Sequence, residues 1–252
     1  MKKITIGLMA TMLVLCIAQG AMAKIDATVG LTLGYENRGY LQETKAGAIV
    51  RKYDISAFLL GLSGKIYFLD RFSAAVDGSV LIGKWDVEGI IVEATLKSWF
   101  NIGLYARYDV LVGEKYKLGV QAGASYDMLN LGWDNSIYSY TSVFMSPGIF
   151  GEIELLPKLK LAADVKLPIG AWFSTTEDKN ANGSYFFKLF LYEAKLALVY
   201  EVMPNINVGI EGKINNMNAY RMQWYGAELK STLYTFSNPL AWSVGLKLEY
   251  KF

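Results

Sequence analysis

Histidine is absent from this chain of 252 residues, and cysteine occurs once, at Cys16. Without histidine the chain lacks the side chain that most simply acts as a general base near neutral pH. Zinc sites built from His and Cys are excluded for the same reason. Cys16 lies in an N-terminal segment that we expect to be removed, so we expect neither disulfides nor thiol chemistry in the mature chain.

Long apolar runs are also missing beyond the N-terminus, although 53% of the residues are hydrophobic and 14% are aromatic. No later segment approaches the roughly 18 consecutive apolar residues that a transmembrane helix requires. High apolar content without such spans is typical of a membrane β-barrel, because each strand presents only every second side chain to lipid.

Neither sign of charge is in excess. The chain has 25 Lys and Arg against 23 Asp and Glu, and two of the lysines, Lys2 and Lys3, lie in the N-terminal segment. A neutral remainder gives no support for a nucleic-acid partner or a polybasic membrane patch. The sequence contains no phosphate-binding glycine loop and no EF-hand spacing, so we expect no cofactor and no metal.

The N-terminal segment has the layout of a secretory signal peptide. Lys2 and Lys3 precede a mostly apolar stretch over residues 4–18, and Ala21-Met22-Ala23 forms a small-x-small cleavage site. The segment is too short and wrongly flanked to span a membrane. We therefore expect export, with residues 1–23 removed and a single mature domain over residues 24–252.

Alternation of apolar and polar residues is clearest at the C-terminal end. From Leu240 to Phe252 every second residue is apolar or aromatic, and those between are small or charged. Successive side chains of a strand point to opposite faces, so this segment is predicted to be a strand with one apolar face. It resembles the assembly signal of bacterial outer-membrane β-barrels, carried here by Tyr250 and Phe252. The resemblance implies recognition by the barrel-assembly machinery.

The same alternation recurs in nine earlier segments, which predicts about ten strands. They lie near residues 25–36, 53–68, 72–83, 100–109, 117–127, 143–154, 159–167, 185–200 and 206–211, and the sixth contains Pro147. Short connections at 69–71, 112–115, 155–158 and 202–205 alternate with long ones at 37–52, 84–97, 128–142, 169–184 and 213–238. Outer-membrane barrels have short periplasmic turns and long extracellular loops. The predicted fold class is therefore all-β, an antiparallel up-and-down transmembrane barrel, with eight or twelve strands as alternatives.

The polar face of the strands indicates which side faces lipid. A soluble barrel with its apolar face inward would show the same alternation. Here the polar face is rich in Gly, Ser and Ala and mixes both charge signs, which fits a crowded lumen better than a surface in water. Aromatic residues near the predicted strand ends are typical of the girdles at membrane interfaces. We therefore predict that the apolar face meets lipid in the bacterial outer membrane.

Charged residues of both signs fall on the predicted lumen face. They are Asp77, Arg107, Asp109, Asp127, Asp164, Lys166, Glu193, Lys195, Glu211, Lys213, Lys247 and Glu249. A barrel of about ten strands has a lumen only slightly wider than one that side chains fill. We expect opposite charges to pair across this space and block it, because unpaired buried charge is costly. A narrow channel is the alternative.

Ten strands with these connections resemble the omptins, a family of outer-membrane proteases. The resemblance is strongest at residues 200–205, 208–212 and 245–252. It implies a catalytic Asp-x-Asp pair facing an Asp-x-His pair across a cleft. The predicted loops offer Asp86 with Glu88, and Asp178 with Asn180 where the histidine would fall. These four residues are weak loop candidates, and the resemblance implies an omptin-like barrel that lacks its catalytic His.

From the sequence we expect a monomeric, non-catalytic barrel with five long extracellular loops. It would act as a surface binding or adhesion protein, or as a structural element of the membrane. Its partners would be outer-membrane lipid and lipopolysaccharide. The alternatives are a narrow channel for small solutes and an omptin-like protease with a degenerate active site.

Overall fold

The computed structural model describes residues 26–44, 49–88, 95–133, 136–175, 183–186, 191–216, 234–237 and 240–252. The predicted signal peptide, residues 1–23, lies outside these ranges. Every regular element in the described residues is a β-strand. None of these residues belongs to a helix that is long and apolar enough to cross a membrane.

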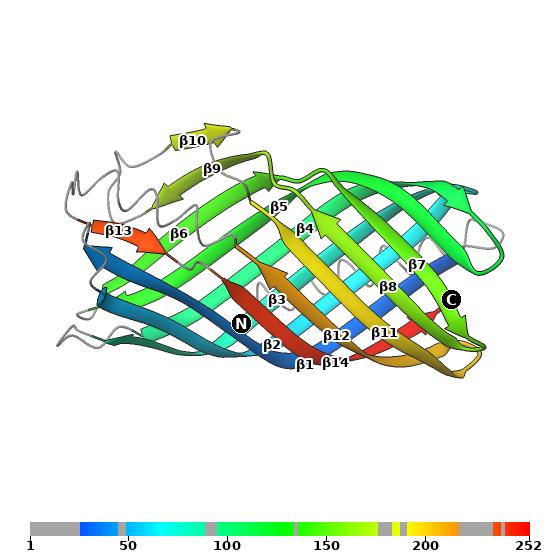
Figure 1. Ribbon diagram of the computed structural model, residues 1–252, viewed down its shortest axis with the longest axis horizontal. Helices are drawn as coiled ribbons and strands as arrows, with labels where there is room; N and C mark the ends of the chain where they lie inside the picture. Colours follow the sequence, from blue (N-terminus) through cyan, green and yellow to red (C-terminus); the bar gives the residue numbers. More distant parts are fainter. Residues whose placement is uncertain are drawn as a thin grey trace.

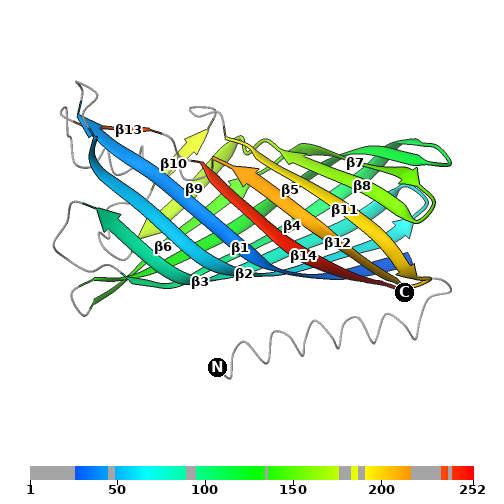
Figure 2. The ribbon, with the colours of Figure 1, turned by 60° about the horizontal axis from the view of Figure 1, so that its bottom comes forward.

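The strands form one antiparallel sheet that closes on itself (Figures 1 and 2). They are β1 (Asp26–Thr44), β2 (Ile49–Leu69), β3 (Phe72–Glu88), β4 (Thr95–Val112), β5 (Tyr116–Trp133), β6 (Ser136–Met145), β7 (Gly148–Leu156), β8 (Leu159–Lys166), β9 (Gly170–Thr175), β10 (Gly183–Phe186), β11 (Glu193–Met203), β12 (Ile206–Asn215), β13 (Tyr234–Ser237) and β14 (Ala241–Lys251). The wall closes because β14 pairs with β1, and β5 pairs with β7 as well as β4.

Four strands of the wall are each divided in two, so the fourteen elements make up ten barrel strands. β6 and β7 both pair with β5, and β13 and β14 both pair with β1. β9 continues β8, and the pairing of β10 with β9 and of β11 with β8 places β10 and β11 in one further strand. The predicted closed, ten-stranded antiparallel barrel is confirmed, and the alternatives of eight and twelve strands are wrong.

Two of the interrupted barrel strands are neighbours in the wall, and each is interrupted at a proline. Pro147 separates β6 from β7, and Pro168 separates β8 from β9. Proline lacks the backbone N–H that a sheet ladder needs. The Leu167 N–H donates to the Pro147 carbonyl at 2.8 Å, and the Ile169 N–H donates to the Met145 carbonyl at 2.9 Å. The predicted end of the seventh strand near Leu167 is therefore wrong, because the strand resumes as β9.

At one end of the barrel, called the turn end here, the connections are short. They occupy residues 70–71, 113–115, 157–158 and 204–205, as predicted to within two residues. The C-terminus lies at this end in Figure 1, where the Phe252 N–H donates to the Ala27 carbonyl at 2.9 Å. Short turns mark the periplasmic end of outer-membrane barrels.

At the opposite, loop end the strands are longer than the sequence predicted. β1 and β2 reach Thr44 and Ile49 through the predicted loop at 37–52, and β5 and β6 leave only residues 134–135 between them. The physical reason is that a hydrogen-bond ladder continues beyond the membrane, where both faces meet water and apolar residues need not alternate. The prediction of five long loops is therefore corrected to extended hairpins joined by shorter connections in several places.

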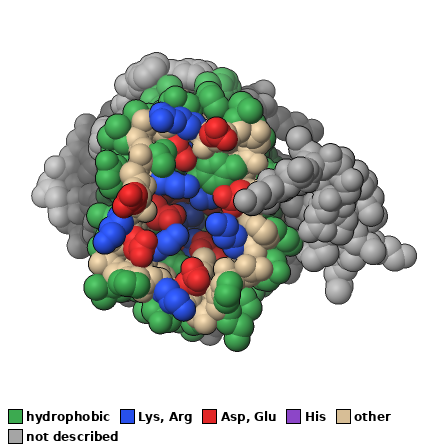
Figure 3. Space-filling model, turned by 90° about the vertical axis from the view of Figure 1, so that its right-hand side faces the viewer, with side chains coloured by type: hydrophobic (Ala, Val, Ile, Leu, Met, Phe, Trp, Pro, Cys, Tyr) green, Lys and Arg blue, Asp and Glu red, His purple; other side chains and the backbone are tan. Residues whose placement is uncertain are grey.

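The apolar face of the wall points outward, as predicted. Large apolar side chains on the exterior are well exposed, with Leu246 at 67% and Leu104 at 65%. Charged side chains on the other face are buried in the lumen, with Glu36 at 1% and Lys166 at 3%. A soluble barrel would show the reverse arrangement. Figure 3 looks onto the turn end and shows apolar side chains surrounding a hollow lined by both charge signs.

Aromatic rings cluster on the exterior near the turn end. Phe72 packs against Tyr108 with ring centroids 4.7 Å apart, and Phe68 stacks on Phe72. The predicted assembly-signal residues Tyr250 and Phe252 lie on the same rim and meet edge to face at 4.9 Å. Amphipathic rings favour the membrane interface, so this belt corresponds to one of the two predicted girdles.

Gly123 supplies a test of packing inside the wall. A Cβ there would lie 2.6 Å from the Tyr105 ring and closer still to the Leu104 carbonyl oxygen. We expect Gly123→Ala to destabilise the barrel by about 1–3 kcal/mol, the usual cost of overpacking. Denaturant unfolding of detergent-refolded protein measures this change. The control is Gly212→Ala, whose Cβ would meet only the Ser243 carbonyl oxygen at 3.8 Å. Equal stability of the two variants would contradict the packing argument.

Candidate functional site

Charged side chains from opposite walls meet at the middle of the lumen. Lys166 on β8 places its Nζ 3.1 Å from Asp77 Oδ2 on β3 and 3.0 Å from Glu193 Oε1 on β11. Lys195 Nζ on β11 lies 3.4 Å from the other Asp77 oxygen. Since β3 is not bonded to β8 or β11 in the sheet, the two ion pairs to Asp77 cross the lumen, whereas Lys166 and Glu193 are opposite each other on neighbouring strands. We call these four residues the central cluster.

A second set of polar contacts lies beside the central cluster. Arg107 on β4 forms an ion pair with Asp164 on β8 and donates a 2.9 Å hydrogen bond from its Nε to Gln121 Oε1 on β5. The Gln121 amide in turn donates to Asp164. Each of the three side chains therefore bonds to the other two, which joins three strands across the inside of the wall.

Tyr105 on β4 contacts the central cluster through its ring. Its side chain is 3% exposed, and its ring covers the backbone of Gly103 and Gly123, where a Cβ would collide with it. Lys166 Nζ lies 4.2 Å from the ring centroid, within the range of a cation–π contact. The two glycines thus create the space for a ring that helps to hold the central lysine.

Towards the loop end, Glu36 is the centre of a third cluster. Its buried carboxylate forms an ion pair with Arg38 and lies 3.4 Å from Lys213 Nζ. The Arg38 guanidinium carbon lies 3.7 Å from the Trp99 ring centroid, and the Trp99 indole N–H donates to Asp127 at 2.7 Å. The lumen is therefore closed by polar contacts at more than one height.

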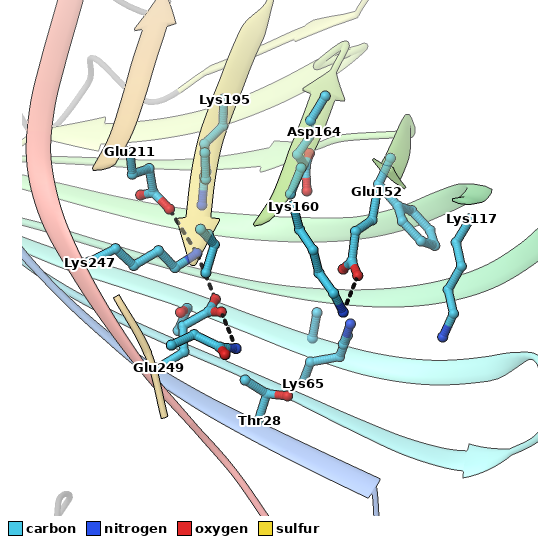
Figure 4. Close-up of a pocket in the computed structure, with 18 of the residues that line it drawn as sticks. Thr28, Lys65, Lys117, Glu152, Lys160, Asp164, Lys195, Glu211, Lys247 and Glu249 are labelled. Atoms are coloured by element: carbon cyan, nitrogen blue, oxygen red, sulfur yellow. Dashed lines mark hydrogen bonds and ion pairs between the residues drawn. The ribbon is translucent and has the colours of Figure 1, made fainter. Parts of the chain in front are cut away.

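Towards the turn end the lumen opens into a charged cavity of about 230 Å³. Figure 4 shows Lys247 between Glu211 and Glu249, and Lys160 reaching Glu152. The Lys247 Nζ lies 3.0 Å from an oxygen of each acid, and the Lys160 Nζ lies 3.1 Å from Glu152. A smaller cavity at the central cluster measures about 50 Å³, and another beside Arg38 and Lys213 measures about 30 Å³.

The structure places the twelve predicted lumen charges on the inner face and pairs most of them with each other. Asp109 instead accepts a 3.2 Å hydrogen bond from the Tyr67 hydroxyl. Several polar residues of these clusters and of the turn-end cavity were not among the predicted ones. They are Glu36, Arg38, Lys65, Lys117, Gln121, Glu152 and Lys160. The alternation of side chains along the strands would have placed all of them on the lumen face except Arg38, which lies in a predicted loop.

The weak loop candidates are not brought together by the described residues. Asp86 and Glu88 lie within β3, so their assignment to a loop is wrong. The reason is the extension of the β2–β3 ladder, in which Asp86 is opposite Asp54 and Glu88 is opposite Lys52. Asp178 and Asn180 lie outside the described residues. Across the described ranges, there is no group of three or more His, Cys, Asp or Glu placed to hold a metal ion.

No protein-family model and no curated protein sequence matches the chain. Among solved structures, the outer-membrane protease OmpT from Escherichia coli aligns with 92% of this chain and 99% of its own, at 13% identity and a TM-score of 0.62. The transport unit of the autotransporter AIDA-I from Escherichia coli covers 92% and 91%, at 11% identity and a TM-score of 0.47. An outer-membrane channel from Pseudomonas putida F1 covers 92% and 97%, at 10% identity and a TM-score of 0.46.

The likeness to OmpT concerns the fold. Together with the closed ten-stranded wall and the apolar exterior, it makes this chain an outer-membrane-type β-barrel, as the sequence predicted. The exterior is the surface that such a barrel presents to lipid.

Because ion pairs cross the lumen, we predict that the barrel does not conduct ions. Planar-bilayer recordings of the refolded wild-type protein should show no large, steady conductance, because Tyr105 and Lys166 obstruct the middle. The double variant Tyr105→Ala/Lys166→Ala should show measurable steps, since it removes both obstructing side chains. The control Leu198→Ala, on the lipid face of β11, should stay closed. Steady porin-like current through the wild type would mean that the central cluster does not seal the lumen.

Proposed function

We propose that this chain is a monomeric, non-catalytic barrel of the bacterial outer membrane that binds partners through the hairpins at its loop end. The observation that supports this proposal best is the ion-paired lumen, whose central cluster leaves no wide path between the two ends. With the lumen filled, the parts of the barrel left for recognition are its two ends. The turn end has short connections, and the loop end has long hairpins such as β1–β2.

The extended hairpins support a role in recognition at the cell surface. In outer-membrane barrels the end opposite the short turns is extracellular. Ladders such as β1–β2 and β2–β3 hold these hairpins rigidly, with pairing that continues to Glu43 and Glu88. A rigid display costs less ordering entropy on binding than a flexible loop. Lipopolysaccharide and membrane lipid are the partners that surround such a hairpin, and the barrel-assembly machinery is the partner proposed for Tyr250 and Phe252.

The absence of histidine from the sequence supports the non-catalytic part of the proposal. An omptin-like mechanism needs a base that takes a proton from water near neutral pH. Asn180 stands where the resemblance places that histidine, and an amide has no titratable proton acceptor. A degenerate protease is therefore the weaker proposal.

A narrow channel is the second candidate function, and the cavity at the turn end is the observation that favours it. This cavity enters the lumen from one side and is lined by charges of both signs. It ends at Asp77 and Asp164, whose ion pairs close the lumen beyond it. Conduction would require these pairs to separate, at a cost that unpaired buried charges make large.

We expect no cleavage of peptides with paired basic residues by the refolded protein in the presence of lipopolysaccharide. Loss of a positioned general base costs on the order of a hundredfold to ten-thousandfold in rate. Activity that disappears in Asp86→Ala or Asp178→Ala would overturn the non-catalytic proposal. Asn180→His is the complementary variant, and activity gained there would mean that the omptin arrangement survives and lacks only its base.

Surface binding is tested by replacing residues 217–233 with a short Gly-Ser linker. Bacteria that display the wild-type barrel should attach to a panel of immobilised matrix proteins and glycans, and those with the linker should attach severalfold less. The control Lys115→Ser lies in the β4–β5 turn at the opposite end and should attach like the wild type. Attachment equal to that of bacteria without the protein would contradict the proposed role.

A further inference from the structure

Two lysines in the turn-end cavity differ from the other cations that line it. Lys65 on β2 and Lys117 on β5 lie 5.1 and 5.0 Å from the same ring centroid, that of Tyr67. Figure 4 shows both on the side of the cavity where Lys160 meets Glu152. Two like charges that share one aromatic ring repel each other, so this arrangement favours a negative ligand between them.

In the described part of the chain, neither of these two lysines forms an ion pair within the cavity, although Glu152 lies opposite Lys117 in the β5–β7 ladder. The cations Arg107, Lys160, Lys195, Lys247 and Lys251 each lie within 4 Å of an acid. Among the residues that the structure describes, Lys65 and Lys117 have no acid at that distance. A cation in a lumen that is partly shielded from water is stabilised by an opposite charge. Glu152 is the neighbouring acid, and its ion pair is made with Lys160.

The acids of the cavity are already engaged. Glu152 is bound to Lys160, Asp164 to Arg107, and Glu249 to Lys247. Asp109 accepts a hydrogen bond from the hydroxyl of Tyr67 at 3.2 Å. Glu152 and Asp109 are the negative groups that would oppose an anion here, and both are held by these contacts. Lys65, Lys117 and Lys160 thus share the nearby carboxylate of Glu152, and the ion pair of that carboxylate is with Lys160.

We propose that this cavity binds a phosphate-sized oxyanion between Lys65 and Lys117, on its turn-end side. Each ammonium group carries three donors, and a phosphate offers several acceptor oxygens, so one anion can accept charge-assisted hydrogen bonds from both lysines. The cavity of about 230 Å³ is many times the ~10–15 Å³ that one buried water requires. Its mouth opens at the end with the short turns, so the anion would come from the periplasmic side (Figure 3). This inference does not depend on the role proposed for the loop end.

The test uses the full barrel, refolded in detergent, titrated with inorganic phosphate at constant ionic strength and followed by phosphorus NMR and calorimetry. The wild type should bind phosphate saturably with one site, and chloride should not replace it at equal ionic strength. Lys65→Gln and Lys117→Gln should each weaken binding about tenfold or more, since each removes charge-assisted hydrogen bonds. Lys65→Arg and Lys117→Arg keep the charge and should retain binding.

The matched control is Lys251→Gln, which removes one positive charge from the same cavity but from a lysine paired with Asp26 at 3.8 Å. It should bind phosphate within about twofold of the wild type, because its charge is exposed and screened. Equal weakening in the control and the Lys65 variant would mean general charge attraction and would overturn the proposal. So would wild-type binding no stronger than that of chloride.

A second titration with glycerol 3-phosphate separates two sources of the same chemistry. Tighter binding of the ester than of inorganic phosphate would identify a phospholipid headgroup as the natural ligand. Tighter binding of inorganic phosphate would identify the free ion. Heat-dependent migration in gels checks that each variant is folded, so a loss of binding is not mistaken for a loss of structure.

Discussion

The structure depends on a constraint set by its solvent: in lipid, every backbone N–H and C=O must bond within the protein. The pairing of β1 with β14, continuous from Thr28 opposite Lys251 to Arg38 opposite Ala241, meets this requirement at the point where the chain closes on itself. A sheet without this last ladder would expose two rows of polar groups to hydrocarbon. The alternation of side chains follows from closure, because a closed sheet has one face to lipid and one to the lumen.

Closure also decides what the lumen must contain. The inner face is narrow, and its charged side chains are buried, so each of them needs a partner of opposite charge. For most of these charges the chain supplies the partner, in part through contacts between strands that are not neighbours, such as Asp77 with Lys166 and Arg107 with Asp164. The interior therefore stabilises the arrangement of the walls. Under the proposed function, recognition falls to the two ends, where the chain meets water.

Much of the fold could be predicted from the sequence because period-two alternation is a local signal. It gave the number of strands, the four short turns and the orientation of both faces. The strand ends at the loop end could not be predicted, since residues such as Arg38 and Asp86 continue the ladder where alternation has faded. The seventh predicted strand ends at Leu167, where alternation stops before Pro168, although hydrogen bonds from Leu167 and Ile169 bridge the gap to the next strand.

The candidate sites were harder to predict than the fold. The alternation of side chains predicts that Lys166 faces the lumen. Its contact with Asp77 cannot be predicted in the same way, because it depends on the tilt and stagger of strands far apart in the chain. The position of Lys65 and Lys117 around one tyrosine ring depends on the same geometry. Asp86 and Glu88 were predicted as site residues from a family resemblance and from their expected position in a loop. The extended β2–β3 ladder shows that they do not lie in a loop.

The paired interruptions at Pro147 and Pro168 divide the wall into two parts with different strand pairing. Below them the wall is a continuous tube, with β7 and β8 bonded along their length. Above them the wall consists of β6, β9 and β10, and β6 pairs with β5. Within the described residues, β10 pairs with β9 alone. Within the described residues, the ladders that join this part of the wall to the rest therefore run through β5, which pairs with β7 below the two prolines and with β6 above them.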